Sequence, residues 1–334
     1  MKNITSLIIV LFVFLSCKNP SESNVFVSNI KDIKGELINV DCLIGRPVDL
    51  VCNDTRLLIY DPYEKKALTI LDTKNNTCIT RELSIGAGPG EVSGPLRIST
   101  SKMGKQLNVF QIQSGIFSTY NFSDDKLTLI ESVRINNRPA NVVATDDALV
   151  GIGPFENGRY QIYNKQGDLA QEVGAYPFDG ENMDPQRRFF LYQGYLCSQP
   201  DGKHFALGSC YSDNLEFYSV EGNEVKLLRR YETEGVKATF ENTIKLDNSC
   251  LLAYKEKYST EKYCYMLYSG KTYEENMFRK MWATHIFVFD WNGNFVKSFR
   301  LDNEVISFCV DESNNTIYGI VLHDGEAAIM KFNM

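Results

Sequence analysis

The chain has 334 residues, of which 43% are apolar and 23% charged, a composition typical of a globular protein rather than a disordered or fibrous one. Its formal net charge is −7, and its Lys and Arg residues are scattered, with no run longer than a pair. Because nucleic-acid backbones are bound by clustered basic residues, this pattern argues against nucleic acid as a partner.

The first seventeen residues have the pattern of a lipoprotein signal peptide. Lys2 precedes an apolar stretch over residues 4–15, and Ser16 stands directly before Cys17. The stretch is shorter than the ~20 residues of a membrane-spanning helix, so we expect anchoring by lipid. Its end, Phe14-Leu15-Ser16-Cys17, resembles the bacterial lipobox, which predicts cleavage after Ser16 and acylation of Cys17. An ordinary signal peptide followed by a coincidental Cys is the alternative.

A strand–turn–strand unit recurs along the rest of the chain. Runs of β-branched and aromatic residues are separated by turns of Asp, Asn and Gly, which supply the positive φ angles of tight hairpins. The clearest copy is IFVFDWNGNFV at 286–296. Aromatic residues at matching positions lie 43 to 71 residues apart, at Tyr60, Tyr120, Tyr163, Tyr218 and Phe289. Propeller blades repeat every ~40–50 residues, so these spacings, with insertions, predict an all-β propeller.

The repeat divides the chain into blades. We predict five complete blades at 47–85, 94–134, 138–174, 190–231 and 250–301. A sixth, with strands at 305–310, 316–321 and 327–332, lacks its outer edge, and we expect the early strand 36–43 to supply it. Six blades are predicted, with seven as the alternative. The expected organisation is a signal peptide at 1–16, a lipidated Cys and polar tether at 17–34, and one propeller domain at 35–334.

Two segments break the repeat and are candidate recognition elements. They are 232–249 and 271–284, the second of which begins at Lys271 and is expected to form a short helix or a loop. Long loops on a rigid scaffold are frequent sites of binding, so Lys271 is included among the candidate ligand-binding residues.

Eight cysteines remain after Cys17, at Cys42, Cys52, Cys78, Cys197, Cys210, Cys250, Cys264 and Cys309. They allow about 105 pairings, and their spacing does not choose among them. No CxxC occurs, so neither a zinc knuckle nor a thioredoxin-type pair is indicated. Cys52 and Cys309 lie inside apolar strand runs, which favours buried free thiols that fill space in the core.

The segment GAGPGE at 86–91 has neither dinucleotide-binding nor Walker spacing. Its glycines favour a structural connector between blades. In the alternative interpretation, Glu91 and the nearby Arg97 line a polar funnel and contact a ligand.

The segment RRFFLY at 187–192 combines a basic pair with aromatic residues. Arg187, Arg188 and Tyr192 could bind an anionic or carbohydrate ligand through guanidinium forks and ring stacking. Alternation favours instead a strand that enters the core with its arginines in solvent.

No pattern of catalytic or metal-binding residues emerges. Segments 290–294 and 311–315 offer oxygen donors suited to calcium, but neither continues into a twelve-residue calcium loop, and we interpret both as hairpin turns. The three histidines, His204, His285 and His323, fall in different predicted blades, and neither GxSxG nor HExxH occurs. We therefore predict no catalytic residue, no metal and no cofactor.

A family resemblance rests on GAGPGE at 86–91, LYSGKT at 267–272, and VFDWNGN at 288–294 followed by VDESNNTIY at 310–318. Together these segments resemble the TolB-like six-bladed propeller lipoproteins of Gram-negative gut bacteria. The resemblance implies six blades and lipidation. It implies no reaction, because a propeller fold does not fix function.

The expected function is that of a non-catalytic binding or scaffold protein. We expect attachment to a membrane through lipid on Cys17, a location in the cell envelope, at the outer membrane facing either the periplasm or the cell surface, and a monomeric domain that recognises a protein, peptide or glycan at one mouth of the propeller. The alternative is a glycan-active hydrolase or lyase with its site at the funnel, because propeller loops distant in sequence can converge there.

Overall fold

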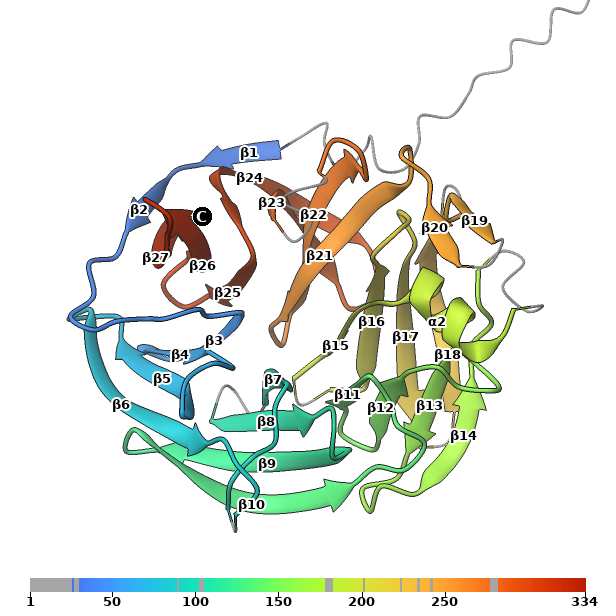
Figure 1. Ribbon diagram of the computed structural model, residues 1–334, viewed down its shortest axis with the longest axis horizontal. Helices are drawn as coiled ribbons and strands as arrows, with labels where there is room; N and C mark the ends of the chain where they lie inside the picture. Colours follow the sequence, from blue (N-terminus) through green and yellow to red (C-terminus); the bar gives the residue numbers. More distant parts are fainter. Residues whose placement is uncertain are drawn as a thin grey trace, which may run out of the picture.

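The computed structural model describes residues 26, 30–88, 90–101, 105–177, 183–200, 202–222, 224–232, 235–240, 243–276 and 282–334. Cys17 and most of the predicted tether lie outside these residues. Six of the β-sheets of the described chain are arranged in a ring around a central axis, which is a six-bladed β-propeller (Figure 1). The prediction of six blades is confirmed, and the seven-bladed alternative is wrong.

Each of the first four blades is built from four consecutive antiparallel strands, with the innermost strand first. Blade 1 contains β3 (Asp49–Asn53), β4 (Arg56–Tyr60), β5 (Lys66–Asp72) and β6 (Thr77–Ser84). Blade 2 contains β7 (Leu96–Ser101), β8 (Gln106–Gln111), β9 (Ile116–Ser123) and β10 (Lys126–Arg134). Blade 3 contains β11 (Asn141–Ala144), β12 (Leu149–Ile152), β13 (Tyr160–Tyr163) and β14 (Leu169–Val173). Blade 4 contains β15 (Gly194–Ser198), β16 (His204–Ser209), β17 (Leu215–Glu221) and β18 (Glu224–Tyr231).

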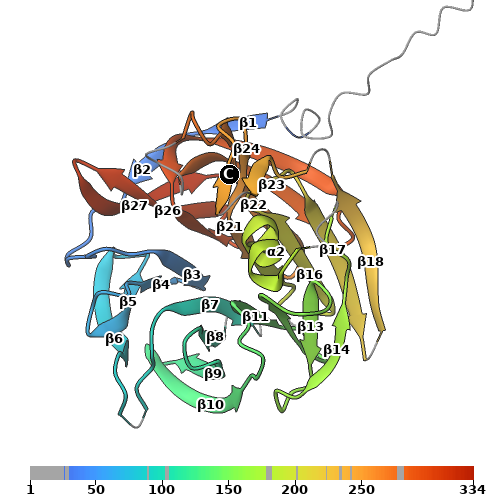
Figure 2. The same cartoon turned by 45° about the vertical axis from the view of Figure 1, so that its right-hand side comes forward.

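The last two blades are completed by the N-terminal segment. Blade 5 contains β21 (Leu251–Ser259), β22 (Tyr263–Thr272), β23 (Ala283–Asp290) and β24 (Phe295–Val305), and β1 (Ile30–Ile33) pairs with β24 in parallel. Blade 6 contains β25 (Ser307–Asp311), β26 (Thr316–His323) and β27 (Glu326–Asn333), and β2 (Gly35–Leu37) pairs antiparallel with β27 as its outer strand. Figures 1 and 2 show the blue N-terminal strands beside the red C-terminal ones.

The prediction that an N-terminal strand closes blade 6 is thus confirmed. The observed strand, β2, spans 35–37 and is shorter than the predicted strand 36–43. The second pairing, of β1 with blade 5, was not predicted, because a four-residue strand with one buried side chain has little periodic pattern of its own. One short stretch therefore fastens two neighbouring blades.

Middle strands are apolar on both faces because each blade packs against two others. In β4, for example, Leu57, Leu58, Ile59 and Tyr60 are all buried. Outer strands such as β10 and β18 face solvent and carry mainly exposed or partly exposed residues. The hairpins turn through residues in the left-handed region, among them Gly293 with φ of 79° and Asn315 with φ of 54°.

The cysteines depart from the sequence prediction. Cys52 in β3 and Cys309 in β25 form a disulfide with their Cα atoms 5.8 Å apart, so the expectation of free thiols at these positions is wrong. Their apolar surroundings are real, but the two inner strands lie side by side where the ring closes, which sequence spacing could not show. A second disulfide joins Cys42 to Cys78, whereas Cys197, Cys210, Cys250 and Cys264 are free.

The segment before blade 4 is helical rather than extended. Helix α2 (Pro185–Tyr192) has Pro at its first turn, and the Asp184 side chain caps it by accepting from the Arg187 backbone N–H. The predicted strand at 187–192 is therefore wrong, since a capped Asp-Pro start outweighs the alternation of the residues that follow. Within 232–249 the chain forms a hairpin of β19 (Ala238–Phe240) and β20 (Ile244–Leu246). No helix among the described residues has the length and apolarity needed to cross a membrane.

Candidate functional site at one mouth of the propeller

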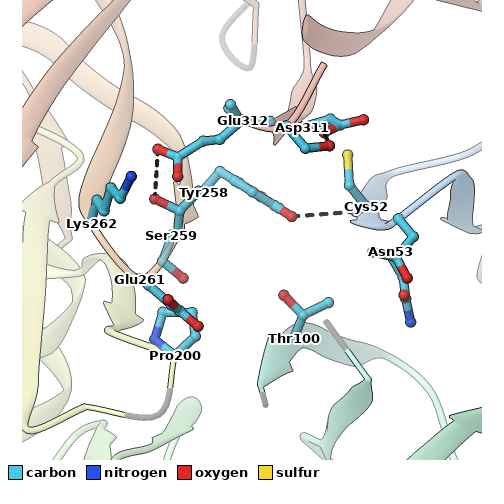
Figure 3. Close-up of a pocket in the computed structure, with 14 residues that line it drawn as sticks. Cys52, Asn53, Thr100, Pro200, Tyr258, Ser259, Glu261, Lys262, Asp311 and Glu312 are labelled. Atoms are coloured by element: carbon cyan, nitrogen blue, oxygen red, sulfur yellow. Dashed lines mark hydrogen bonds between the residues drawn. The ribbon is translucent and has the colours of Figure 1, made fainter. Parts of the chain in front are cut away.

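A pocket of about 340 Å³ opens where the innermost strands end. It is lined by Asn53 of β3, Thr100 of β7, Ser259 of β21 and Asp311 of β25, each at or next to the last residue of its strand. Pro200, which follows β15, completes the wall (Figure 3). Five blades therefore contribute to one hollow, which is the usual way a propeller assembles a site from segments far apart in sequence.

The rim of this pocket is mostly acidic. The carboxylates of Asp54, Glu261, Asp311 and Glu312 line it, against the single ammonium group of Lys262. Asp54, Glu261 and Lys262 are exposed, so these charges face an incoming ligand. The excess of carboxylates gives the mouth a negative potential, which favours cationic or hydroxyl-bearing ligand groups and opposes polyanions.

Two of the carboxylates are held by neighbouring groups. The Thr260 hydroxyl and the Tyr265 hydroxyl donate to Glu312 Oε1 at 3.0 and 2.9 Å, which ties the β21–β22 hairpin to the adjacent blade. Asp311 Oδ1 accepts from the Ser313 hydroxyl at 2.6 Å and from the Asn314 backbone N–H at 3.1 Å. Asp311 therefore organises the β25–β26 turn, and the prediction of a hairpin turn at 311–315 is confirmed.

Tyr258 forms the floor of the pocket. Its ring extends from blade 5 towards blade 1, where its hydroxyl accepts from the Cys52 backbone N–H at 3.4 Å (Figure 3). Burial raises the pKa of Tyr258 to about 12. Beneath it lies a cavity of only about 10 Å³ that Cys197 and Lys257 help to line. A ligand would therefore rest at the mouth rather than pass along the central axis.

An ion pair lies on β21, the innermost strand of blade 5. Lys257 Nζ lies 3.3 Å from Glu256 Oε1, next to a bulge in the pairing of β21 with β22. Burial raises the pKa of the Glu256 carboxyl, the Asp49 carboxylate adds to this, and the cations of Lys257 and Arg97 oppose it. A bulge changes the direction of the side chains in the strand that contains it, which explains how two consecutive charged residues of a strand come close enough to pair.

Arg97 and Glu91 occupy different surroundings. Arg97, on the innermost strand of blade 2, is exposed. Its positive charge opposes the rise in the pKa of the Glu256 carboxyl. Glu91 accepts from the Gly88 backbone N–H at 2.8 Å, and its carboxylate lies where a Cβ atom on Gly86 would have to be. The contacts of Gly86, Gly88 and Glu91 thus agree with the connector between blades that the glycines favoured.

The predicted residues of the RRFFLY segment divide between surface and interior. Arg187 is exposed and pairs with Asp184 at 3.1 Å. Arg188 is buried, donates to the carbonyl oxygens of residues 155 and 156 at 2.7 Å, and lies 4.8 Å from the centre of the Tyr176 ring. Tyr192 is buried against the same ring. Arg188 is therefore not in solvent, contrary to the interpretation favoured from alternation.

Lys271 lies at the end of β22, where it is exposed and pairs with Glu304 at 3.0 Å. None of the six predicted binding residues lines the pocket of Figure 3. The residues that do line it are the last residues of inner strands and the residues that directly follow them. No shared motif in the sequence marks these distant segments as neighbours. The histidines lie on β16, β23 and β26, in three different blades as predicted.

A second hollow of about 520 Å³ lies at the opposite end of the inner strands. Val48 and Ile306, which precede β3 and β25, help to line it together with Arg46, Tyr63 and Trp282. Tyr63 is 74% exposed, so it offers a position for a control substitution remote from the first pocket.

The fold and its mouth define the class of the protein: a six-bladed β-propeller with a pocket of mixed charged and apolar lining where its inner strands end. Residues 25–313 match the family described as TolB-like 6-blade propeller-like, and the chain belongs to that family. No curated protein matches the chain.

Solved structures that are similar to this one include two from Bacteroides species. A protein described as exported, from Bacteroides fragilis, is 13% identical with a TM-score of 0.56, and the match covers 91% of this chain and 99% of that one. A member of the DUF4221 family from Bacteroides vulgatus is 9% identical with a TM-score of 0.55, covering 91% of this chain and 97% of that one. At these identities the likeness shows the fold alone.

Proposed function

We propose that this protein is an exported, lipid-anchored propeller that binds a protein, peptide or glycan of the cell envelope at the mouth described above, without transforming it. The observation that carries the proposal is the pocket of about 340 Å³ built from the strand ends of five blades. Its size is within the range of small-molecule sites and suits one residue of a larger ligand, such as a side chain or a sugar ring.

The lining of the pocket supports this kind of ligand. Tyr258 and Pro200 offer apolar surface, while Glu261, Lys262 and Asp54 offer charged groups at the rim. A combination of one ring face with surrounding hydrogen-bonding groups suits sugars and polar side chains. The acidic excess favours a neutral glycan or a peptide with a basic residue over a phosphorylated or sulfated ligand.

Location in the envelope is proposed from the N-terminus and the cysteines. Residues 1–17 have the order of a lipoprotein signal peptide, and disulfides persist mainly in oxidising compartments such as the periplasm and the cell surface. Replacing Cys17 with Ser should release the protein from membranes in a fractionation experiment. Continued sedimentation of the Cys17→Ser protein with membranes would contradict the proposed anchor.

A paired binding experiment tests the mouth. The mature protein and the double variant Glu261→Ala/Lys262→Ala are screened against defined peptides and neutral oligosaccharides, with Tyr63→Ala at the opposite hollow as the matched control. Because all three residues are exposed, the substitutions should leave the fold intact. A ligand bound by the wild type and by Tyr63→Ala, but at least about tenfold more weakly by the double variant, supports the proposal. Equal loss in Tyr63→Ala, or none in the double variant, contradicts it.

The second candidate is a glycan hydrolase or lyase, which the four carboxylates of the rim favour. Glycosidic hydrolysis needs two carboxyl groups about 5–10 Å apart across the scissile bond. Each oligosaccharide that binds is therefore incubated with the protein and analysed for cleavage by mass spectrometry. Cleavage lost on replacing Glu261 with Gln would establish the enzyme instead of the binding protein.

A further inference from the structure

Two free cysteines meet between blades 4 and 5. Cys197 lies on β15, the innermost strand of blade 4, and Cys264 lies on β22 of blade 5. Their Sγ atoms are 3.5 Å apart, and both side chains are buried, at 2% and 0% exposure. They belong to a single apolar cluster that spans the two blades. A contact this close needs only a further approach of about 1.5 Å to reach the ~2.05 Å of an S–S bond.

The same chain already uses this kind of link. Cys52 and Cys309, which are 257 residues apart, join the innermost strands of blades 1 and 6. That bond and the Cys42–Cys78 bond indicate an oxidising environment. Cys197 likewise lies on an innermost strand, and Cys264 meets it from the second strand of the next blade.

We propose that Cys197 and Cys264 form a third disulfide, which joins blade 4 to blade 5. Two thiols each lose a proton, and the pair gives up two electrons to a protein or low-molecular-weight disulfide, which is reduced to two thiols as the Sγ–Sγ bond forms. The ring would then be held covalently at two junctions. One is the junction of blades 1 and 6, and the other is that of blades 4 and 5, which follow each other in the chain.

Because both cysteines are buried in the folded protein, we expect the disulfide to form before blades 4 and 5 pack together. Burial, followed by the neighbouring Cys197 sulfur, raises the pKa of the Cys264 thiol well above its ordinary value, although the Lys257 ammonium group favours the thiolate. In the folded protein both sulfurs are also shielded from an external oxidant. Exchange therefore takes place during folding, and the bond, once buried, should resist reduction.

Peptide mapping of the mature protein purified from the cell envelope tests the proposal. The protein is denatured with iodoacetamide present, so that every free thiol is blocked, and is digested with trypsin without reduction. Cys197 lies in the tryptic peptide 189–203 and Cys264 in 263–271, each as its only cysteine. We expect a linked pair of these two peptides, and alkylated peptides 204–226 and 246–255, which contain Cys210 and Cys250.

The Cys52–Cys309 link is the internal control, because it shows that the sample was oxidised. Alkylated Cys197 and Cys264 in a sample with that link intact would overturn the proposal. The variant Cys197→Ser should expose Cys264 to alkylation, whereas the matched variant Cys250→Ser, also at a fully buried cysteine, should leave the 189–203 and 263–271 link unchanged. The wild-type map decides the question even if a variant fails to fold.

Discussion

The junctions between blades 1 and 6 and between blades 3 and 4 are fastened by different means. At the first, strands from the two ends of the chain meet, and the Cys52–Cys309 disulfide together with the pairing of β2 with β27 holds them. At the junction of blades 3 and 4, the two blades are consecutive in the chain, and buried charged side chains connect their sheets.

The charged junction centres on Glu216, a fully buried residue of β17. Arg159 of blade 3 approaches its carboxylate at 3.1 Å, Arg230 of blade 4 at 2.8 Å, and the Tyr160 hydroxyl donates to it as well. Arg159 also donates to the Tyr192 carbonyl oxygen at 3.3 Å, which connects helix α2 to the network. Burial and then the Glu216 charge raise the pKa of Tyr160 well above its ordinary value, so the phenol stays protonated and donates.

The difference follows from connectivity. Blades 3 and 4 are tethered by their own chain, so their contact needs orientation, which a network of directed hydrogen bonds provides. Blades 1 and 6 lie at opposite ends of the sequence, and bringing them together costs the entropy of closing the whole ring. A covalent bond reduces that cost because it restricts the unfolded chain.

The largest effect is expected at the ring closure. The double variant Cys52→Ser/Cys309→Ser should lower the free energy of unfolding by about 5 kcal/mol, since the disulfide closes a loop of 257 residues. Removing Cys42–Cys78, which closes 36 residues, should cost about 4 kcal/mol on the same entropic basis. Urea unfolding of both variants measures the difference. A larger loss from the shorter loop would mean that loop closure does not set the cost.

The next effect is expected at the charged junction. Glu216→Gln should cost about 3–5 kcal/mol, because Arg159 is left buried without its counter-charge. The control Glu224→Gln, at an exposed position of the same blade, should change stability by less than about 0.5 kcal/mol. A triple replacement, Arg159→Met/Glu216→Leu/Arg230→Met, should recover much of the loss, because no buried charge then lacks a partner. Thermal and urea unfolding test both expectations.

A third effect concerns the N-terminal fastening. Phe26 is 4% exposed and packs against Tyr231, Phe287, Phe289 and Phe295 between blades 4 and 5. Phe26→Ala should cost about 3 kcal/mol and loosen the stretch that contains β1. Faster cleavage of that stretch by a protease, with the rest of the propeller resistant, is the expected result. Phe190→Ala, at a position 37% exposed, is the control and should leave the cleavage rate unchanged.

The smallest effect is on pH dependence. Burial, then repulsion from Arg300 and Lys271, lowers the pKa of His285 below its ordinary 6.5, and burial also lowers the pKa of His204. Below about pH 6.5 the unfolded chain therefore takes up protons more readily than the folded one, so the free energy of unfolding should fall between about pH 7 and pH 5. His285→Gln should flatten this slope in a series of urea titrations. An unchanged slope would show that His285 is not its source.

The blades could be predicted from local sequence because the formation of a hairpin depends on residues that are close together in the chain. Alternation and Asn-Gly turns, as in 286–296, predicted strands whose limits agree with β23 and β24 to within a few residues at most ends. The closing strand was foreseen because the sixth blade visibly lacked a partner. Helix α2 was not, since its Asp-Pro start gives a capping signal that competes with the alternation of the next six residues.

The sequence by itself determined the all-β class, six blades, closure of blade 6 by the N-terminus and the turn residues at 290–294 and 311–315. Only the tertiary structure decided which cysteines pair and which residues share the mouth. Cys52 and Cys309 meet across 257 residues, and the pocket collects strand ends from five blades. These contacts depend on how the ring closes. A local pattern of apolar and turn residues predicts a strand or a turn, but it does not specify which distant segment will lie beside that strand.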